Sequence, residues 1–444
     1  MWQNSRLVLK FYVLVGEAMS EALQAIRGMD DLLPGESDLW LYVEDTIRSV
    51  IEQHGYDHIR MPIVEQTELF ARGVGETTDV VEKEMYTFND RNELSLSLRP
   101  EGTAGCVRAC QQHGLLYNQI QRLWYQGPMF RYEKPQKGRN RQFHQVGLEV
   151  FGIGSAEIDA EVIAMNHRMW RRLGIEQAVT LQINTIGSAQ ARMAHRKALV
   201  AFLEQYRSEL DEDSQRRLDK NPLRILDSKV ASTQALLKDA PALSNYIDDE
   251  SAEHFEAVKA SLTRLGIEFE VNETLVRGLD YYNGTVYEWV TDALGAQGTI
   301  CGGGRYDGLV EQLGGRPTPA FGCGIGMERV TLLLKAVAEA KQSSRRGLDA
   351  YGIALGDAAN KQLHAILDRI RDQALSLRIR MHCGTGKANK LLKKAADSGA
   401  EYALIVGESE LAEGTVTLKP LRGQGDAKTI AVDDAGSVLL MDKQ

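Results

Sequence analysis

Two strand-like segments joined by a basic loop constrain the fold of this chain more than any other feature. Residues 122–132 and 141–151 have the pattern of strands, and the loop between them is polar and basic. Two such strands that follow each other across a short loop pair as an antiparallel hairpin. The sequence therefore predicts a sheet that is at least partly antiparallel.

The hairpin has an informative distribution of polar side chains. Alternation places Phe143, Gln145 and Glu149 on one face of the second strand, while Arg131 and Glu133 belong to the first. The connecting segment, with Arg131 at its start, contains five basic residues and one acid. A charged loop alone is usually a solvated surface, but a polar row on a strand of an otherwise apolar sheet usually lines a site. We therefore expect a binding site at the hairpin.

The remaining elements of the first three quarters follow from hydrophobic periodicity. Between 188 and 268 the pattern is helical and strongly charged, which indicates an insertion packed on the main domain. A glycine-rich stretch follows at 302–326. The expected helices are 38–54, 155–174 and 327–340, and the expected strands are 58–62, 94–99, 269–275 and 284–291.

The length of the chain and a change of pattern indicate more than one domain. A chain of 444 residues is too long for one ordinary domain. From about 351 to 406, strand and helix patterns alternate, as is typical of a small α/β domain with a largely parallel sheet. The expected parts are an N-terminal extension at 1–18 with Met19 as the natural start, a main domain at 19–340, a polar linker at 341–347 and a C-terminal domain at 348–444.

Charge and cysteine content disfavour several classes of protein. A net charge of −9 argues against a broad, non-specific nucleic-acid binder, although local basic patches can still bind phosphate. The five cysteines form no CxxC pair, which disfavours a disulfide framework or a zinc site and favours a reducing cytoplasm. The apolar run 7–15 is too short to span a bilayer and contains Lys10, so we expect no association with a membrane.

Three strings resemble the motifs of the class II aminoacyl-tRNA synthetases. The helix and strand ending at Pro62 are similar to the first motif, FRYE at Phe130–Glu133 to the second, and GCGIGMER at Gly322–Arg329 to the third. Each string alone is a weak signal, but three in the right order and spacing are a strong one.

Further strings narrow the resemblance to the bacterial histidyl-tRNA synthetases. They are LRPEGT at Leu98–Thr103, LVRGLDYYN at Leu275–Asn283, and CGGGRYDGL from Cys301. The resemblance covers roughly residues 23–340, and the tail from about 347 is similar to the anticodon-binding domain of that family.

The resemblance implies an architecture and a reaction. The fold would be an α+β catalytic domain with an antiparallel sheet, a helical insertion and a C-terminal α/β anticodon-binding domain. The enzyme would activate histidine with ATP and transfer it to tRNA(His). ATP would be a substrate accompanied by Mg²⁺, and the expected assembly is a cytoplasmic homodimer.

The resemblance also assigns residues to ATP. Adenylate formation brings a carboxylate to the α-phosphate, so two anions meet and the site requires fixed positive charge. Arginine suits this task because its planar fork grips phosphate oxygens and stays charged. By resemblance, Arg131 and Arg277 hold the α-phosphate and Arg329 holds the γ-phosphate. Phe143 would stack on adenine, and Glu133 would accept from its amino group.

A second set is implied to bind histidine. Glu149 and Tyr282 can pair with the imidazole nitrogens, and sites built on specific hydrogen bonds discriminate by roughly 10⁴–10⁵ against analogues that leave them unmade. Gln145 is expected both to bind the ammonium group and, with Arg131 and Arg277, to act in catalysis. The whole set is Glu101, Thr103, Gln145, Glu149, Tyr281, Tyr282 and Tyr306.

The basic loop has an implied role toward tRNA. In the family this loop reaches the acceptor end, and the residues implied here are Lys134, Gln136, Lys137 and Arg139. Lys134 and Tyr132 depart from the family pattern, in which arginine and histidine are common. Since lysine is a point charge, not a fork, phosphate contact should survive, while the recognition of the 5′ end stays open.

The C-terminal domain contains a basic helical stripe, Lys387, Lys390, Lys393 and Lys394. It could face the tRNA backbone or only solvent, and the sequence leaves both interpretations open. The neighbouring Gly384–Lys387 is similar to part of a P-loop, but Met381 replaces a required glycine and Ala388 replaces the required hydroxyl residue.

Three rival interpretations are weaker. A regulatory paralogue that charges no tRNA usually lacks the C-terminal domain and the Arg277 segment, and both are present here. A pseudo-synthetase sensor would lose catalytic arginines and accompany a kinase signature. A class II synthetase for another amino acid is disfavoured by Glu149 together with the Arg277–Tyr282 string.

Overall fold

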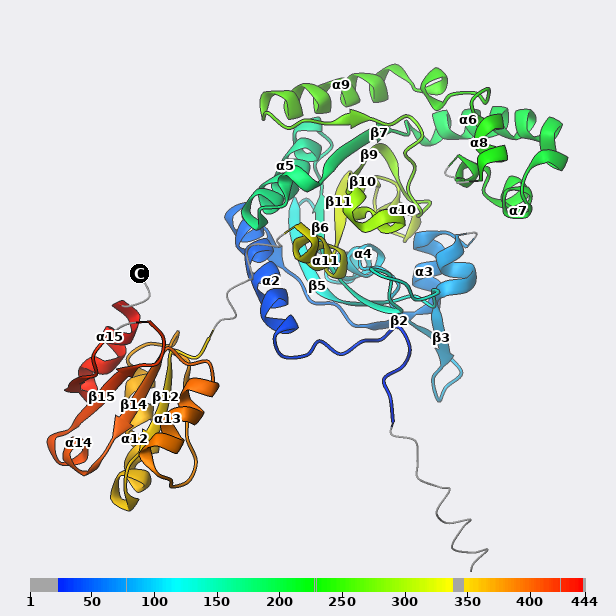
Figure 1. Cartoon of the computed structure of the whole chain (residues 1–444). Helices are drawn as coiled ribbons and strands as arrows, with labels where there is room; N and C mark the ends of the chain where they lie inside the picture. The colour runs from blue at the N-terminus through cyan, green and yellow to red at the C-terminus, as the bar shows by residue number, and fades with distance from the viewer. Residues whose placement is uncertain are drawn as a thin grey trace, which may run out of the picture. The chain divides into compact units, whose positions relative to one another are not determined.

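The computed structural model describes residues 23–337 except 77, 227 and 229, and residues 347–441 except 424. The chain divides into two compact units, Met1–Ala340 and Lys341–Gln444 (Figure 1). The expected extension at 1–18 and nearly all of the expected linker at 341–347 lie outside the described residues. Among the described residues, no helix is both long and apolar enough to cross a membrane.

An eight-stranded sheet organises the first unit. The β5–β6 pair is antiparallel over its whole length, from Gln121 opposite Phe151 to Phe130 opposite Gln142, which confirms the predicted hairpin. The edge pairs β1–β5 and β7–β8 are parallel, and the other pairs are antiparallel. In spatial order the strands are β1 (Asp57–His58), β5 (Gln121–Phe130), β6 (Gln142–Phe151), β11 (Ala320–Gly326), β10 (Thr299–Arg305), β9 (Asn283–Val290), β7 (Thr180–Thr185) and β8 (Glu270–Val271).

Strand alternation divides the side chains of this sheet between two hydrophobic clusters. Val146, Leu148 and Val150 of β6 pack with helices that cover one face of the sheet. Phe143 and Phe151 pack on the opposite face with α4 and α10. The odd-numbered positions of β6 therefore share a face, as the alternation predicted. The helices of the first cluster are α2 (Glu36–Gln53), α5 (Ala156–Leu173), α9 (Asp249–Arg264) and α11 (Met327–Val337), and those of the second are α4 (Thr103–Gln112) and α10 (Leu309–Gln312).

A smaller subdomain precedes the hairpin in sequence. Its three strands form the order β2-β4-β3, and α3 packs on them. The elements are β2 (Val64–Gln66), α3 (Thr67–Val74), the π-helix η1 (Val80–Glu84), β3 (Tyr86–Asn89) and β4 (Ser95–Leu98).

The charged segment after β7 is helical. Its first part has its own apolar cluster, which includes Leu199, Leu203, Leu210 and Ile225. Its last helix, α9, packs instead against α5 of the main sheet (Figure 1). The other α-helices of this segment are α6 (Ala189–Leu203), α7 (Glu212–Lys220) and α8 (Ala231–Leu237), and its short 3-10 helices are η3 (Glu204–Glu209), η4 (Pro222–Ile225) and η5 (Leu243–Tyr246). Two further 3-10 helices lie outside it, η2 (Glu176–Ala178) before β7 and η6 (Asp292–Gln297) after β9.

The second unit is only partly as predicted. Strands β12, β13 and β14 pair in parallel, as the alternation of strands and helices predicted. After β14 the chain turns back, and β15 and β16 pair antiparallel, so the sheet is mixed rather than largely parallel. The elements are β12 (Ala350–Ala354), α12 (Asp357–Asp372), β13 (Ile379–Met381), α13 (Ala388–Asp397), β14 (Tyr402–Val406), α14 (Glu408–Glu413), β15 (Thr415–Pro420), β16 (Lys428–Ala431), η7 (Val432–Asp434) and α15 (Ala435–Met441).

Three predicted boundaries were wrong. The strand expected at 58–62 is the two-residue β1, which pairs only with Leu123 and Trp124 of β5. The strand expected at 269–275 is the two-residue β8, which pairs only with the edge of β7. Strand β5 ends at Phe130, so Arg131 and Glu133 lie just beyond the strand rather than on it.

Candidate active site

A polar pocket lies at the loop end of the β5–β6 hairpin. It encloses about 180 Å³ between the hairpin loop, strands β10 and β11, and the start of α11. Its lining includes all of the residues implied to bind ATP, although they lie as far apart in the chain as Arg131 and Arg329. We call it the arginine pocket, and its lining includes Arg131, Glu133, Arg139, Phe143, Gln145, Arg277, Glu328 and Arg329.

The arginines of this pocket are oriented by backbone and aromatic contacts. Arg131 donates from Nε to the carbonyl of Pro100 at 2.9 Å, and its guanidinium lies 5.3 Å from the centre of the Phe143 ring. Arg329 donates to the carbonyls of Gly138 at 3.0 Å and Thr299 at 2.7 Å. These contacts orient the two guanidinium groups, and Arg131 also lies 4.0 Å from the carboxylate of Glu133.

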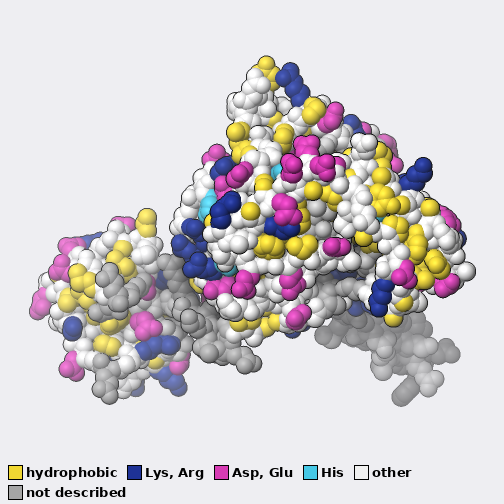
Figure 2. Space-filling view, turned by 90° about the horizontal axis from the view of Figure 1, so that it is seen from above, with side chains coloured by type: hydrophobic (Ala, Val, Ile, Leu, Met, Phe, Trp, Pro, Cys, Tyr) yellow, Lys and Arg dark blue, Asp and Glu magenta, His cyan; other side chains and the backbone are white. Residues whose placement is uncertain are grey.

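Electrostatics show that positive charge is concentrated in the pocket. Burial, together with the nearby cations of Arg139 and Arg131, lowers the pKa of Arg329 to about 10. Burial also lowers the pKa of Arg131, with a contribution from Arg277. By contrast, acidic and basic side chains are interspersed on the outer face in Figure 2. A buried site with several mutually repelling cations is built for a polyanion.

Arg277 links the pocket to a neighbouring group of tyrosines. It forms an ion pair with Glu288 of β9, and its guanidinium lies 5.7 Å from the centre of the Tyr282 ring. Tyr281 and Tyr282 lie 4.6 Å apart by ring centres, and Tyr306 lies 5.6 Å from Tyr281. The residues implied to bind ATP and those implied to bind histidine therefore adjoin each other.

Glu149 is the centre of a buried hydrogen-bond cluster. Its carboxylate is fully buried and accepts from the hydroxyls of Thr103 at 2.8 Å, Tyr125 at 2.8 Å and Tyr306. Burial raises the pKa of Glu149 to about 8, against the effect of the three hydroxyl donors. We call Thr103, Tyr125, Glu149 and Tyr306 the Glu149 cluster. Tyr282, which the sequence paired with Glu149 in reading imidazole, lies beside Tyr306 rather than among the donors to Glu149.

Tyr125 is the member of this cluster that the sequence reasoning missed. It lies on β5 opposite Gly147 of β6, and only 2% of its surface is exposed. Its position in the sequence could have revealed it, because alternation places Tyr125 on the same face of the hairpin as the polar row of β6. A tyrosine among apolar neighbours is nevertheless most simply a core residue.

Glu101 has a structural role that is visible in its contacts. Its carboxylate accepts from the backbone N–H groups of Thr103 at 2.6 Å and Ala104 at 2.9 Å, at the start of α4. It thereby caps the orphan donors of the first helical turn. The same contacts bring Thr103 to Glu149, so Glu101 organises the cluster even before any ligand is considered.

The glycines of β10 and β11 make room for the functional side chains. A Cβ atom on Gly322 would lie 2.1 Å from the carboxylate of Glu149, and one on Gly324 would lie 2.3 Å from the amide of Gln145. A Cβ atom on Gly302 would lie 2.7 Å from the guanidinium of Arg277. Gly302 lies within strand β10, opposite Gly324 of β11.

The residues implied to contact tRNA divide into two groups. Lys134, Gln136 and Lys137 are exposed on the loop after β5. Arg139 instead forms an ion pair with Glu133 and lines the arginine pocket. Tyr132, which departs from the family pattern, is exposed and lies under the guanidinium of Arg141, 4.0 Å from the ring centre.

Comparison with known proteins assigns the chain to a family. A model of the histidyl-tRNA synthetase catalytic domain matches residues 28–330, which is more than half of the chain. The chain belongs to the histidyl-tRNA synthetase family. A model of the anticodon-binding domain matches residues 349–441. As a histidine–tRNA ligase of this family, the protein charges tRNA with histidine and uses ATP as a substrate.

Solved structures support the same assignment. The chain is 33% identical to the apo histidyl-tRNA synthetase of S. aureus, covering 94% of this chain and 99% of that one with a TM-score of 0.77. It is 22% identical to histidyl-tRNA synthetase from Nostoc sp. PCC 7120, covering 95% and 100% of the two chains with a TM-score of 0.68, which shows the fold alone. Together these matches confirm the class II synthetase fold with its anticodon-binding domain.

Proposed function

We propose that the arginine pocket binds ATP and that the Glu149 cluster, with Tyr281 and Tyr282, binds histidine. The histidine carboxylate attacks the α-phosphorus, the bond to the β-phosphate oxygen breaks, and histidyl-adenylate and pyrophosphate form. A ribose hydroxyl at the 3′ end of tRNA(His) then attacks the activated carbonyl and displaces AMP. The observation that carries this proposal is the convergence of four arginines beside the buried Glu149 cluster.

The arginines have distinct roles in the first step. Arg131 and Arg277 hold the α-phosphate while charge develops on it, and Arg329 holds the γ-phosphate. Phe143 stacks on adenine, and Glu133 accepts from its amino group. The distance of 5.3 Å between Arg131 and the Phe143 ring supports this placement, because adenine stacked on Phe143 leaves its phosphates near that arginine.

Histidine is held by two sets of groups. Glu101, Thr103 and Gln145 receive the ammonium group, and Gln145 also orients the attacking carboxylate. Glu149, Tyr282 and Tyr306 recognise the imidazole, and Tyr281 completes the wall. The contacts of Tyr306 support this assignment, because its hydroxyl donates to Glu149 and its ring centre lies 6.5 Å from that of Tyr282.

Mg²⁺ is expected to accompany the nucleotide. The arginine pocket fits a hard cation to a limited extent, because Glu133 and Glu328 supply carboxylate oxygens on its lining. Glu328 already accepts from the backbone N–H of His144 at 2.8 Å. When bound, the ion neutralises phosphate charge, and most of its ligands would be phosphate oxygens and water.

The first motif offers a surface for a second copy of the chain. Leu41 and Tyr42 of α2 are 54% and 46% exposed, and Ile63 and Val64 at the start of β2 are 40% and 38% exposed. Strand β1 is also an edge of the main sheet. Exposed apolar side chains beside an open strand edge favour association, and we propose a cytoplasmic homodimer through this face.

The tRNA would be bound by both units. Lys134, Gln136, Lys137 and Arg139 are placed to meet the acceptor end, and the C-terminal unit to bind the anticodon. The lysine stripe of α13 is exposed at all four positions, which is compatible with either the tRNA backbone or solvent. We propose the boundaries 19–340 and 348–444 for the two functional domains, with the helical insertion at about 188–268.

Exchange of pyrophosphate with ATP, measured with each of the twenty amino acids and without tRNA, tests the proposal. Exchange with histidine alone is expected. Arg277→Ala should reduce it by roughly 10²–10³-fold, as expected when a preorganised charge is removed from a transition state. Arg122→Ala is the matched control. Arg122 lies on β5 and forms an ion pair with Glu161 at 2.9 Å, and it does not line the arginine pocket. Normal exchange by a folded Arg277→Ala protein would refute the assigned role.

A further inference from the structure

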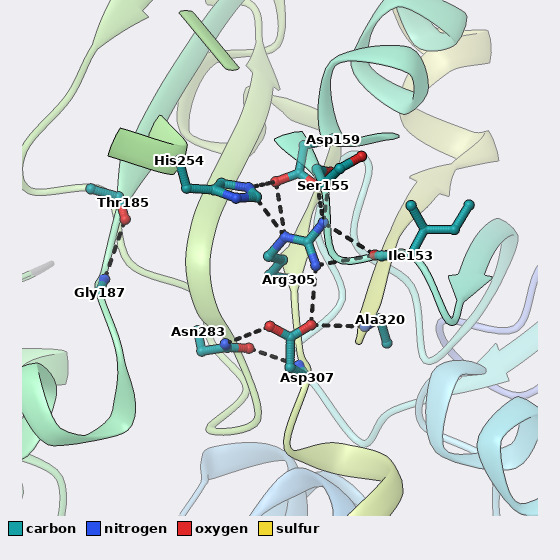
Figure 3. A network of polar contacts seen from close by, with 10 residues as sticks. All are labelled: Ile153, Ser155, Asp159, Thr185, Gly187, His254, Asn283, Arg305, Asp307 and Ala320. Carbon is teal, nitrogen blue, oxygen red and sulfur yellow. Dashed lines mark hydrogen bonds and ion pairs between the residues drawn. The ribbon is translucent and has the colours of Figure 1, made fainter. Parts of the chain in front are cut away.

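A second polar network lies at the end of β10 (Figure 3). Arg305 is 4% exposed and donates to the fully buried carboxylate of Asp159 at 2.5 and 3.1 Å. It also donates to the carbonyls of Ile153 and Ser155. His254 of α9 approaches the same carboxylate, with 2.8 Å between Nε2 and Oδ2. None of these residues lines the arginine pocket or belongs to the Glu149 cluster.

Asp307 extends this network to the neighbouring strands. Its Oδ1 accepts from Arg305 at 3.2 Å and from the backbone N–H of Ala320 at 2.8 Å. Its Oδ2 accepts from Nδ2 of Asn283 at 3.1 Å, and its own backbone N–H donates to Oδ1 of Asn283 at 2.8 Å. Asn283 and Asp307 therefore exchange two hydrogen bonds whose donor and acceptor directions are fixed.

The network alternates along the chain with residues proposed to read histidine. Asn283 directly follows Tyr282, and Tyr306 lies between Arg305 and Asp307. In Figure 3, Asn283 at the start of β9 and Asp307 just after the end of β10 point toward each other. The Asn283–Asp307 pair thus joins the two chain segments that carry Tyr282 and Tyr306.

Stability alone is a weak reason for such an arrangement. Replacing a buried ion pair by apolar residues of similar volume is often neutral or stabilising, because desolvation offsets the attraction. A directional network does specify the relative position of the backbones that it joins. Hydrogen-bonded recognition needs its groups within roughly 0.5 Å of the productive geometry, so the position of the two tyrosines matters.

We propose that Asn283 and Asp307 are positioning residues that set Tyr282 and Tyr306 around the histidine side chain. This inference rests on the proposed function, since it assumes that both tyrosines touch histidine. Neither residue touches a reacting group. Both act through the tyrosines that adjoin them in sequence, so their effect should fall on histidine rather than on ATP.

Exchanging the two side chains tests the proposal. Asn283→Asp alone sets two carboxylates against each other, and Asp307→Asn alone sets two amide donors against each other. In the double variant, the carboxylate now at position 283 can accept from both the new amide and the backbone N–H at position 307, so the directions match again. The double variant keeps the net charge of the natural pair and changes only where it lies.

The measurement is the KM for histidine and for ATP, with kcat, in pyrophosphate exchange by the full-length protein. Each single variant should raise the KM for histidine by roughly tenfold to a hundredfold, since a displacement of ~1 Å can cost ~10²-fold. The KM for ATP should stay within about twofold of the natural protein, and the double variant should recover most of the loss. Asp349→Asn is the matched control, because it changes a buried carboxylate of the C-terminal unit that accepts the backbone N–H of Arg378 at 2.7 Å.

Two results would overturn the proposal. One is an equal change in both KM values, and the other is a double variant no better than the single ones. If Asp307→Asn does not fold, Asn283→Ser removes one bond without adding a charge, and it should still raise the KM for histidine selectively. A natural protein without histidine-dependent exchange would instead refute the proposed function, so the two failures are distinguishable.

Discussion

At the scale of single residues, Glu149 shows how a charge-bearing group can be buried inside a sheet. It has no exposed surface, yet three hydroxyl groups donate to its carboxylate. Gly322 on the adjacent strand leaves the space that the carboxylate occupies. A buried acid with several specific partners is typical of a recognition site rather than of a core, because a core of apolar residues avoids the cost of desolvation.

Glu149 should make the stability of the protein depend on pH. The unfolded chain loses this proton near the ordinary pKa of 4.5, whereas the folded protein keeps it up to about pH 8. The stabilisation from this group is therefore complete below pH 4.5 and is lost as pH rises to about 8. The side chain of the Glu149→Gln variant cannot titrate, so the variant serves as the reference. The free energy of unfolding of the natural protein, relative to that of the variant, should fall by on the order of a few kcal/mol as pH rises through this window. Denaturant titrations that give the same difference at about pH 5 and about pH 8.5 would contradict this.

At the scale of secondary structure, the functional side chains pack directly against glycines of strands β10 and β11. At several of these glycines, a functional side chain from another element occupies the space that a Cβ atom would fill, as Arg277 does at Gly302. Glycine is unfavourable in strand interiors, so its repeated use there indicates close approach by other groups. The glycines of these two strands therefore serve the functional side chains that pack against them.

Two neighbouring glycines should give opposite results on substitution. In Gly302→Ala the new Cβ meets only the far end of the Arg277 side chain, so folding should be nearly unchanged while exchange falls by roughly 10²-fold. In Gly303→Ala the Cβ would lie 2.1 Å from the carbonyl oxygen of Gly322, so the sheet itself must move. That variant should lose about 1–3 kcal/mol of stability or fail to fold. Thermal unfolding and exchange assays on both proteins distinguish these outcomes, and equal stabilities would contradict the argument.

At the scale of the whole molecule, the two units have separate hydrophobic cores. The clusters around Leu148 and Phe151 belong to the first unit, and those around Leu367 and Leu391 belong to the second. Each unit therefore has its own reason to fold, and the pocket proposed for activation lies wholly in the first.

A chain ending at Ala340 should keep histidine-dependent exchange close to that of the natural protein. Charging of tRNA should fall by roughly 10²-fold or more, because one of two linked binding modules is lost. Circular dichroism checks that the shortened protein is folded, and the two assays should then diverge. Equal loss of exchange and charging by a folded protein would show that the second unit is needed for activation itself.

The sequence by itself determined the hairpin, the shared face of Phe143, Gln145 and Glu149, and most helices, because these follow from the local period of apolar and polar residues. It also supplied motifs that led to the family and to a candidate set of site residues, whose roles remain proposals. The local pattern is sufficient here because successive residues of a strand point to one of only two faces.

Only the tertiary structure decided which distant groups meet. Tyr125 as a partner of Glu149, Arg139 as a pocket residue, and the Asn283–Asp307 pair all depend on strand order and register. The antiparallel return of β15 and β16 likewise depends on which sheet edge was free. A sequence records the spacing of residues along the chain, whereas these contacts are set by the packing of segments far apart in it, and that packing is decided by the whole core at once.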